Sequence, residues 1–302
     1  MNLVFVVIFA VVVSSHRNYP YASADWIKKT KELKAQLANR IVSTSNAFNQ
    51  TNCEIVSFRK NSTSIPRTII TSFPGSGNTW FRHLIHTGSG YYTGSIYNDG
   101  KLIARGFKGE QLDWSDNRTV GIKIHQYGSA SKLAHKMHKT AGEVFPKTLL
   151  IVRSPFKAIL SEFNRLNNPS HSHTGEADEK LFKDGTFLNF LELQLPRWGR
   201  SIAKWMNDYR GEVQTVCYEN LKENTSKVLK KSLEFMEVPF LRPECIEQAE
   251  QKHGYFKRNS KNINVTKMIK DEARLQHMAE MILNGVRSSF KRKNLEDCTV
   301  YF

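Results

Sequence analysis

The sequence predicts an α/β protein in which a mostly parallel β-sheet is flanked by helices within one large domain. From Arg67 onward, short apolar runs alternate with stretches of helical periodicity, as in successive βαβ units. The first apolar run leads directly into a glycine-rich loop and then into a helical pattern. With 40% hydrophobic and 24% charged residues among 302, the chain can bury a full core.

The strands are expected where β-prone residues gather in short runs, and the helices where apolar residues recur with helical spacing. The expected strands are Thr68–Phe73, Val120–His125, Thr148–Arg153 and Gln214–Tyr218. The clearest helices are Thr79–His86, Phe156–Asn164, Leu188–Tyr209 and Thr225–Met236. Because helices separate the strands, the strands are predicted to pair in parallel. Trp198 and Trp205 lie seven residues apart on one of these helices, which favours core packing.

The first 65 residues predict two segments outside this domain. Residues 1–24 contain an apolar run of 11 residues, Leu3–Val13, which is short for a membrane span of about 20. No Lys or Arg precedes the run, and it fits either a cleaved signal peptide or a short type II membrane anchor. Residues 25–65 indicate a stem, with an amphipathic helix over Ala24–Val42 and a polar linker over Asn46–Pro66. The folded domain is expected over 66–302.

The cysteines and glycosylation motifs are compatible with an oxidising compartment. None of the four cysteines lies in a CxxC pair, so no zinc or other metal site is expected. Cys217 falls in an apolar strand and is expected to stay free, and Cys245 with Cys298 is the expected bridge. N-x-S/T sequons occur at Asn49, Asn61, Asn117, Asn224 and Asn264.

The net charge of +16 suits a partner that carries several negative charges. Charge alone does not choose among a phosphorylated nucleotide, an anionic glycan and a nucleic acid, and a solvated basic surface would give the same value. No RNA- or DNA-binding motif is evident, and the basic residues are spread along the chain. A nucleic-acid partner is therefore not expected.

A phosphate-binding loop is predicted after the first strand. The loop residues that offer backbone or side-chain donors are Gly75, Ser76, Gly77, Asn78 and Thr79, followed by Trp80. Glycines allow tight turns in which backbone N–H groups and a helix N-terminus face an anion. This indicates a P-loop-type fold, although GxxxxGK[ST] is absent, which disfavours a nucleotide kinase or an ATP- or GTP-hydrolysing enzyme. A structural glycine turn is the alternative.

A second anion site is predicted at Arg153. This residue ends a strand and is followed by Pro155, which suits a first helical turn. Arg153 is thus expected at the carboxyl edge of the sheet, where ligands of open α/β folds bind. Ser161 follows eight residues later on the helix, so the two side chains can hold one phosphate dianion. Pairing of Arg153 with a nearby carboxylate is the alternative.

These segments resemble the sulfotransferases that use 3′-phosphoadenosine 5′-phosphosulfate (PAPS). Ser72–Trp80 resembles their 5′-phosphosulfate loop, and Ile151–Arg165 their 3′-phosphate motif. Val213–Met236 resembles the segment with an adenine-contacting Tyr, and Gly121–His125 the K-x-H strand with the catalytic His. Phe256-Lys257-Arg258 is similar to the late basic motif over the 3′-phosphate. SFPGSGNTW, GSIYND and GFKGE are most similar to the sulfotransferase domain of WSC-domain-containing, Golgi-type, glycan-directed proteins.

The resemblance implies a sulfotransferase fold over 66–302, PAPS as co-substrate and PAP as product. Its implied donor-binding residues are the loop Gly75–Trp80, together with Arg153, Ser161, Tyr218, Lys257 and Arg258. Trp80 can stack on adenine or fill the core, and Tyr218 can contact adenine or be structural. The chain departs from cytosolic sulfotransferases, which carry Lys where this chain has Gly75.

The catalytic residues are expected on the K-x-H strand. Side chains alternate along a strand, so Lys123 and His125 face the same side. His125 is the expected general base, because neutral imidazole accepts a proton near pH 7. Lys123 is expected to balance charge on the leaving phosphate in place of the missing loop Lys. Glu110 is the alternative base, and a structural His125 is the alternative to catalysis.

By resemblance, the acceptor is expected to be a carbohydrate on a glycoprotein or glycolipid, including an acidic one such as a sialylated chain. The expected location is the Golgi lumen or membrane, or outside the cell after signal cleavage. A catalytically weak or inactive protein with the same fold, which binds a nucleotide or glycan, is the alternative, because the loop Lys is missing.

Overall fold

The computed structural model describes residues 53, 55–60, 66–125, 144–170, 172, 174–251, 256 and 263–302. Residues Cys53–Phe302 form one compact unit, which confirms the prediction of a single α/β domain. The apolar run Leu3–Val13, the helix expected over Ala24–Val42 and most of the polar linker lie outside the described residues. Among the described residues, no helix combines the length and the apolar character that a membrane crossing requires.

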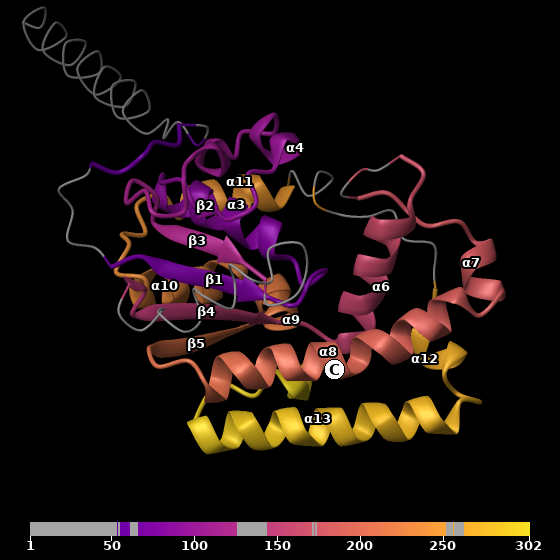
Figure 1. The fold of residues 1–302 in the computed structure, drawn as a ribbon. Helices are drawn as coiled ribbons and strands as arrows, with labels where there is room; N and C mark the ends of the chain where they lie inside the picture. The colour runs from indigo at the N-terminus through magenta and orange to yellow at the C-terminus, as the bar shows by residue number, and fades with distance from the viewer. Residues whose placement is uncertain are drawn as a thin grey trace, which may run out of the picture. The chain divides into compact units, whose positions relative to one another are not determined.

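A five-stranded parallel sheet organises the domain, with the spatial order β2-β3-β1-β4-β5 (Figure 1). The strands are β1 (Thr68–Ser72), β2 (Gly94–Ser95), β3 (Gly121–Ile124), β4 (Lys147–Val152) and β5 (Glu212–Cys217). The four strands expected from the sequence are present, and each ends one residue before its expected end. Phe73, His125, Arg153 and Tyr218 therefore follow the strands. The edge strand β2 was not expected, because two residues give no periodicity.

Side chains of the central strands alternate between two apolar layers, as the pleat requires. Ile69, Ile122 and Leu150 point into one cluster, whereas Ile70, Leu149 and Ile151 point into the other. All six are at most 1% exposed. Because both faces are covered, apolar residues lie on both sides of the central strands, as with Ile69 and Ile70 of β1 and Leu149–Val152 of β4.

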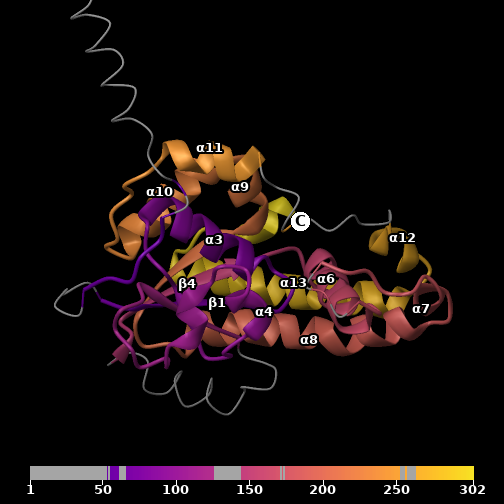
Figure 2. The same cartoon turned by 90° about the horizontal axis from the view of Figure 1, so that it is seen from above.

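Helices cover both faces of the sheet (Figures 1 and 2). The cluster around Ile69 receives side chains from α6 (Pro155–Asn167), α8 (Thr186–Asn207), α12 (Val265–Met268) and α13 (Ala273–Lys293). The cluster around Ile70 receives them from α3 (Asn78–Ser89), α9 (Tyr218–Glu223), α10 (Thr225–Phe235) and α11 (Glu244–Gln251). The shorter elements are α4 (Gly100–Ile103), α7 (Lys180–Lys183) and the 3₁₀ helices η2 (Lys108–Gln111) and η4 (Cys298–Tyr301).

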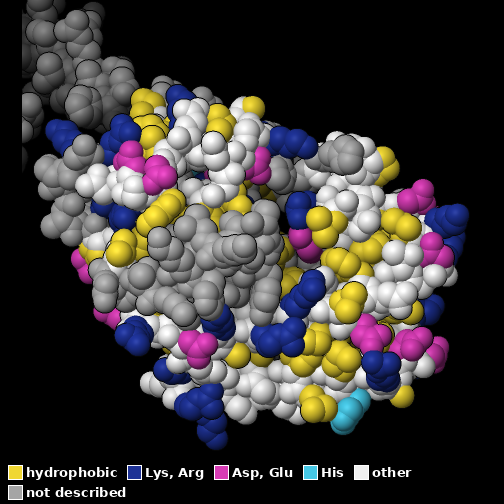
Figure 3. All heavy atoms as spheres, in the orientation of Figure 1, with side chains coloured by type: hydrophobic (Ala, Val, Ile, Leu, Met, Phe, Trp, Pro, Cys, Tyr) yellow, Lys and Arg dark blue, Asp and Glu magenta, His cyan; other side chains and the backbone are white. Residues whose placement is uncertain are grey.

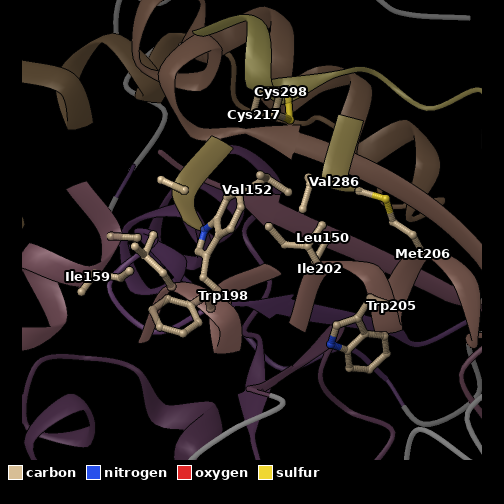
Figure 4. Close-up of a cluster of buried hydrophobic side chains, with 14 of the residues drawn as sticks. Leu150, Val152, Ile159, Trp198, Ile202, Trp205, Met206, Cys217, Val286 and Cys298 are labelled. Carbon is tan, nitrogen blue, oxygen red and sulfur yellow. A yellow bond between two sulfur atoms is a disulfide. The ribbon is translucent and has the colours of Figure 1, made fainter. Parts of the chain in front are cut away.

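The close-up in Figure 4 shows the core between the sheet and helices α8 and α13. Trp198 and Trp205 of α8 are fully buried there beside Leu150 and Val152 of β4, as their spacing predicted. The same view shows the disulfide Cys217–Cys298 at the edge of this cluster.

The disulfides differ from the sequence-based expectation. The bridges are Cys53–Cys245 and Cys217–Cys298, so the expected Cys245–Cys298 bridge and the expected free Cys217 are both wrong. A free thiol and a disulfide are both apolar enough to be buried. The burial of Cys217 therefore does not show whether it is free or bridged. Cys298 reaches Cys217 because η4 packs against the end of β5.

Candidate active site at the carboxyl edge of the sheet

The candidate functional residues lie at the carboxyl edge of the sheet, where the chain stops adding strands on one side of β1 and starts adding them on the other. Strand β1 lies between β3 and β4, and the chain places β2 on one side of it and β5 on the other. Ligands of open α/β sheets bind outside the carboxyl ends of the strands at such a switch point. The loop after β1, His125 after β3, Arg153 after β4 and Tyr218 after β5 all follow this edge.

The loop after β1 has the backbone of an anion site. Gly75 and Gly77 adopt φ of 79° and 85°, and α3 begins directly afterwards at Asn78. Such φ values suit glycine, and the first N–H groups of the helix have no partner within it. Ser76 Oγ is buried and has no hydrogen-bond partner among the described residues. The loop thus offers a buried hydroxyl and the N-terminus of a 12-residue helix to an anion.

Gly75 leaves no room for a side chain. A Cβ atom at this position would lie 2.2 Å from the carbonyl oxygen of Ala158 on α6. The positive φ adds strain for any other residue. The loop Lys of cytosolic sulfotransferases is therefore incompatible with this packing of the loop against α6.

Arg153 connects the loop to the second predicted anion site. Its Nη1 donates a hydrogen bond to the carbonyl oxygen of Gly75 at 2.7 Å. Its guanidinium carbon lies 4.4 Å from the ring centroid of Tyr218, a cation–π geometry. Trp198 Nε1 donates to the Arg153 carbonyl at 3.1 Å and fixes the backbone. The Nε of Arg153 is buried and has no partner among the described residues, so a donor remains for a ligand.

The other residues expected to bind the donor differ in their exposure and in their position along the sheet edge. Ser161 is half-buried on α6, two turns after its start. Trp80 is 7% exposed and packs in the core, with its ring edge-on to Tyr218 at 5.7 Å. Tyr218 is half-buried at the start of α9, and a Cβ on Gly77 would lie 2.4 Å from its ring. Lys257 and Arg258 lie outside the described residues.

His125 is held in one tautomer. Its Nδ1 lies 2.7 Å from the carbonyl oxygen of Ser72. A carbonyl only accepts, so Nδ1 carries the proton and Nε2 keeps its lone pair. Burial, followed by the positive charge of Lys123, lowers the pKa of His125 to about 3, despite the bond to Ser72. The imidazole is therefore neutral at pH 7, and Nε2 accepts no hydrogen bond from any residue within the described ranges.

Lys123 and His125 are both half-buried. Burial and the positive charge of Arg82 lower the pKa of Lys123 to about 8, although Glu110 acts in the opposite direction. Its Nζ lies 5.4 Å from the ring centroid of Tyr97. At pH 7 the side chain is still mostly a cation, and a modest rise in pH removes its charge.

Glu110 is committed to a buried ion pair. Its Oε1 accepts from Arg82 Nη1 at 2.5 Å, and both side chains are 0% exposed. Its Oε2 accepts the backbone N–H of Asp99 at 3.2 Å. Burial raises the pKa of Glu110, but the charges of Arg82 and Lys123 outweigh burial and bring it below the usual value. Both oxygens face protein donors, which favours a positioning role.

Sequence reasoning missed three residues of this region. Arg82 is fully buried in α3, Tyr97 hydrogen-bonds the backbone of His125, and Arg165 contributes positive charge at His125 and Lys123. A charged residue inside the apolar pattern of α3 could have identified Arg82. Tyr97 lies within GSIYND and Arg165 ends the segment Ile151–Arg165, so both were inside motifs that the sequence analysis quoted. Their roles were not assigned, because these depend on the packing of β2 and α6.

Two other kinds of site, a metal centre and a nucleic-acid surface, place different requirements on the described residues. No group of three His, Cys, Asp or Glu side chains in the described ranges is placed to hold a metal ion. On the face drawn in Figure 3, Lys and Arg are scattered among acidic and apolar side chains. A nucleic-acid surface is more often a continuous basic stripe.

Comparison with known proteins matches residues 66–296 to the sulfotransferase domain family. The WSCD family member AAEL009094 of Aedes aegypti is 33% identical over 60% of this chain and 53% of its own length. The WSCD family member CG9164 of Drosophila melanogaster is 32% identical over 64% of this chain and 57% of its own length. The chain thus spans about half the length of these curated relatives.

Among solved structures, mouse sulfotransferase SULT7A1 in complex with PAP aligns over 70% of this chain and 72% of that chain. The TM-score is 0.42 and the sequence identity 18%. The family match covers most of the chain and includes every strand of the sheet. The two curated relatives named above are WSCD family members, and the chain belongs to the sulfotransferase domain family.

Proposed function

We propose that this chain transfers a sulfuryl group from PAPS to a hydroxyl of a carbohydrate acceptor in the secretory pathway. The observation that carries the proposal is the hydrogen bond from Arg153 Nη1 to the Gly75 carbonyl. This bond supports the proposal because it joins the loop after β1 to the residue that follows β4 at the same edge of the sheet. A donor with a phosphate near each end of one adenosine can then contact both.

The residues at this edge fit such a donor. The N-terminus of α3 and the orphaned hydroxyl of Ser76 suit the 5′-phosphosulfate. The free Nε of Arg153 and the hydroxyl of Ser161 suit the 3′-phosphate. Tyr218 and the edge of Trp80 offer aromatic surface for adenine.

His125 and Lys123 supply the chemistry in this proposal. The acceptor oxygen bonds to sulfur, the bond between sulfur and the 5′-phosphate oxygen breaks, and PAP leaves. The acceptor proton passes to His125 Nε2, whose lone pair is available because Nδ1 is the protonated nitrogen. The Lys123 cation balances charge on the departing phosphate oxygen. Negative charge on the bound donor raises the pKa of His125 from its low value and makes it a stronger base.

The disulfides, the N-terminal apolar run and the net charge support the acceptor class and the compartment in this proposal. Both disulfides favour an oxidising compartment, because such bonds are rare in the cytosol. The apolar run Leu3–Val13 fits a signal peptide or a type II anchor for the Golgi. The net charge of +16 favours an acidic glycan on a glycoprotein or glycolipid.

One observation favours a second candidate, a nucleotide- or glycan-binding protein with little activity. Gly75 excludes the loop Lys that stabilises the leaving phosphate in cytosolic sulfotransferases. If Lys123 does not replace that charge, the site binds its donor without efficient transfer.

An activity assay separates the two candidates. Purified protein is incubated with ³⁵S-labelled PAPS and a panel of neutral and acidic glycans. We expect labelled product, and roughly 10²–10⁴-fold less with His125→Ala. The matched control is His277→Ala, which removes an exposed histidine on α13. PAP binding without labelled product would support the binding protein, and full activity of His125→Ala would exclude His125 as the base.

A further inference from the structure

We propose that Tyr97 is a positioning residue for sulfuryl transfer, in which one side chain fixes the backbone of His125 and contacts the ammonium of Lys123. The proposal rests on the function proposed above. It assigns no contact between Tyr97 and the donor or acceptor. Tyr97 acts through the two residues of the K-x-H strand.

The chain path brings Tyr97 to the end of β3. Ser95 of β2 pairs with Lys123 of β3, and Ile96 N–H donates to the Lys123 carbonyl at 3.3 Å. The backbone of Tyr97 is then turned by its own N–H, which donates to Ser95 Oγ at 3.0 Å. The side chain therefore leaves the edge strand beside the last residues of β3.

The phenol hydroxyl replaces a missing strand partner. The pairing of β3 with β1 ends at Ile124, so the N–H of His125 has no ladder partner. That N–H donates to Tyr97 Oη at 2.7 Å, and the carbonyl oxygen of His125 lies 3.5 Å from the same hydroxyl. Burial raises the pKa of Tyr97 to about 12, so the hydroxyl remains a neutral phenol.

The aromatic ring of Tyr97 contacts both catalytic candidates. Its centroid lies 5.8 Å from that of His125, at an interplanar angle of 38°. The ammonium of Lys123 lies 5.4 Å from the same ring, within cation–π range. Ser72 fixes the imidazole through Nδ1, and Tyr97 fixes the backbone that carries it. Ser72 and Tyr97 together fix the direction in which the Nε2 lone pair points, and a general base needs such a fixed orientation.

Steady-state kinetics of Tyr97→Phe and Tyr97→Leu test this role. Phe keeps the ring and loses the hydroxyl, so we expect kcat to fall about tenfold, the value of one hydrogen bond, with KM for PAPS within about twofold. Leu loses the ring as well, so kcat should fall further. Tyr92→Phe is the matched control, because Tyr92 is a buried tyrosine of the same segment whose ring is tilted against Phe58 and edge-on to His86. Its kcat should not change.

Binding and NMR measurements keep the test decisive. PAP affinity of Tyr97→Phe should equal that of wild type. The ring ¹⁵N shifts of His125 should move from the Nδ1-protonated pattern toward a tautomer mixture. Unchanged kcat, or a parallel loss of kcat, PAP affinity and thermal stability, would overturn the positioning role. If wild type transfers no sulfate, the proposed function fails, whereas the His125 shifts still decide the role of Tyr97: unchanged shifts refute it.

Discussion

Desolvation lowers the pKa values of Lys123, on β3, and of His125, which directly follows β3. The pKa of His125 falls to about 3 and that of Lys123 to about 8. One side chain is therefore a neutral acceptor and the other still a cation at pH 7. A general base and a charge stabiliser need these opposite states at the same pH.

At the residue scale, the Lys123 cation predicts a basic limb in the pH–rate profile. A lowered pKa means that the charge is present below about pH 8 and lost above it. We expect kcat/KM for PAPS to fall above about pH 8, because this parameter reports the free enzyme. Lys123→Arg should keep the charge and remove the limb, since arginine does not deprotonate in this range. Lys291→Arg, an exposed substitution on α13, is the control. An identical limb in Lys123→Arg would exclude Lys123 as its source.

Local sequence pattern could predict which residues share a strand face but not what surrounds them. Alternation along the strand predicts that Lys123 and His125 share one face, and desolvation is the largest cause that lowers the pKa of each. The ion pair of Arg82 with Glu110 joins residues that are 28 positions apart in the sequence. Tyr97 and His125, which are hydrogen-bonded, have the same sequence separation. Such pairs follow from tertiary packing, which a local pattern does not encode.

At the element scale, the loop after β1 depends on its contact with α6. Gly75→Ala would place Cβ 2.2 Å from the Ala158 carbonyl at a positive φ. Because backbone atoms cannot yield cheaply, we expect the loop to shift, with at least about tenfold weaker PAP binding by calorimetry and a loss of roughly 1–3 kcal/mol in unfolding free energy.

Gly185→Ala is the matched control for this prediction. Gly185 has a similar φ of 82°, but a Cβ there meets nothing within 4 Å. It should lose stability from backbone strain and keep its PAP affinity. Unchanged PAP affinity in Gly75→Ala would contradict the proposed role of the loop.

The elements themselves were largely predictable. Long apolar runs and helical spacing identified four strands and the helices α3, α6, α8 and α10, because both faces of the sheet are buried. The two-residue strand β2 could not be predicted from local pattern, although it aligns Tyr97 with His125. A short edge strand owes its existence to pairing with β3 and not to its own residues.

At the scale of the whole molecule, the two disulfides tie distant segments to different parts of the domain. Cys217–Cys298 joins the end of β5, directly before Tyr218, to the 3₁₀ helix η4. Cys53–Cys245 joins the segment before β1 to α11. Pairing could not be deduced from the sequence, since four cysteines allow three complete pairings.

Removing each bridge should have different effects. The double variant Cys217→Ser/Cys298→Ser should lose roughly 2–5 kcal/mol of stability, seen as a lower Tm, and should also bind PAP more weakly because Tyr218 is adjacent. Cys53→Ser/Cys245→Ser should lose stability and keep its PAP affinity. Equal PAP affinities in the two variants would show that the Cys217–Cys298 bridge does not support the donor site.

The central claim is that one donor with two phosphates spans the loop after β1 and Arg153, and nucleotide selectivity tests it most directly. Calorimetry compares PAP with adenosine 5′-phosphate, which lacks the 3′-phosphate, in wild type, Arg153→Ala, Ser161→Ala and the exposed control Arg200→Ala. Wild type and the control should prefer PAP by about 100-fold, the value of two charge-assisted hydrogen bonds. Ser161→Ala should lose much of this preference while binding adenosine 5′-phosphate almost as before. Arg153→Ala should also lose the preference, and it should bind both nucleotides more weakly because its bond to the Gly75 carbonyl is lost as well. Equal affinity of wild type for the two nucleotides would contradict the account.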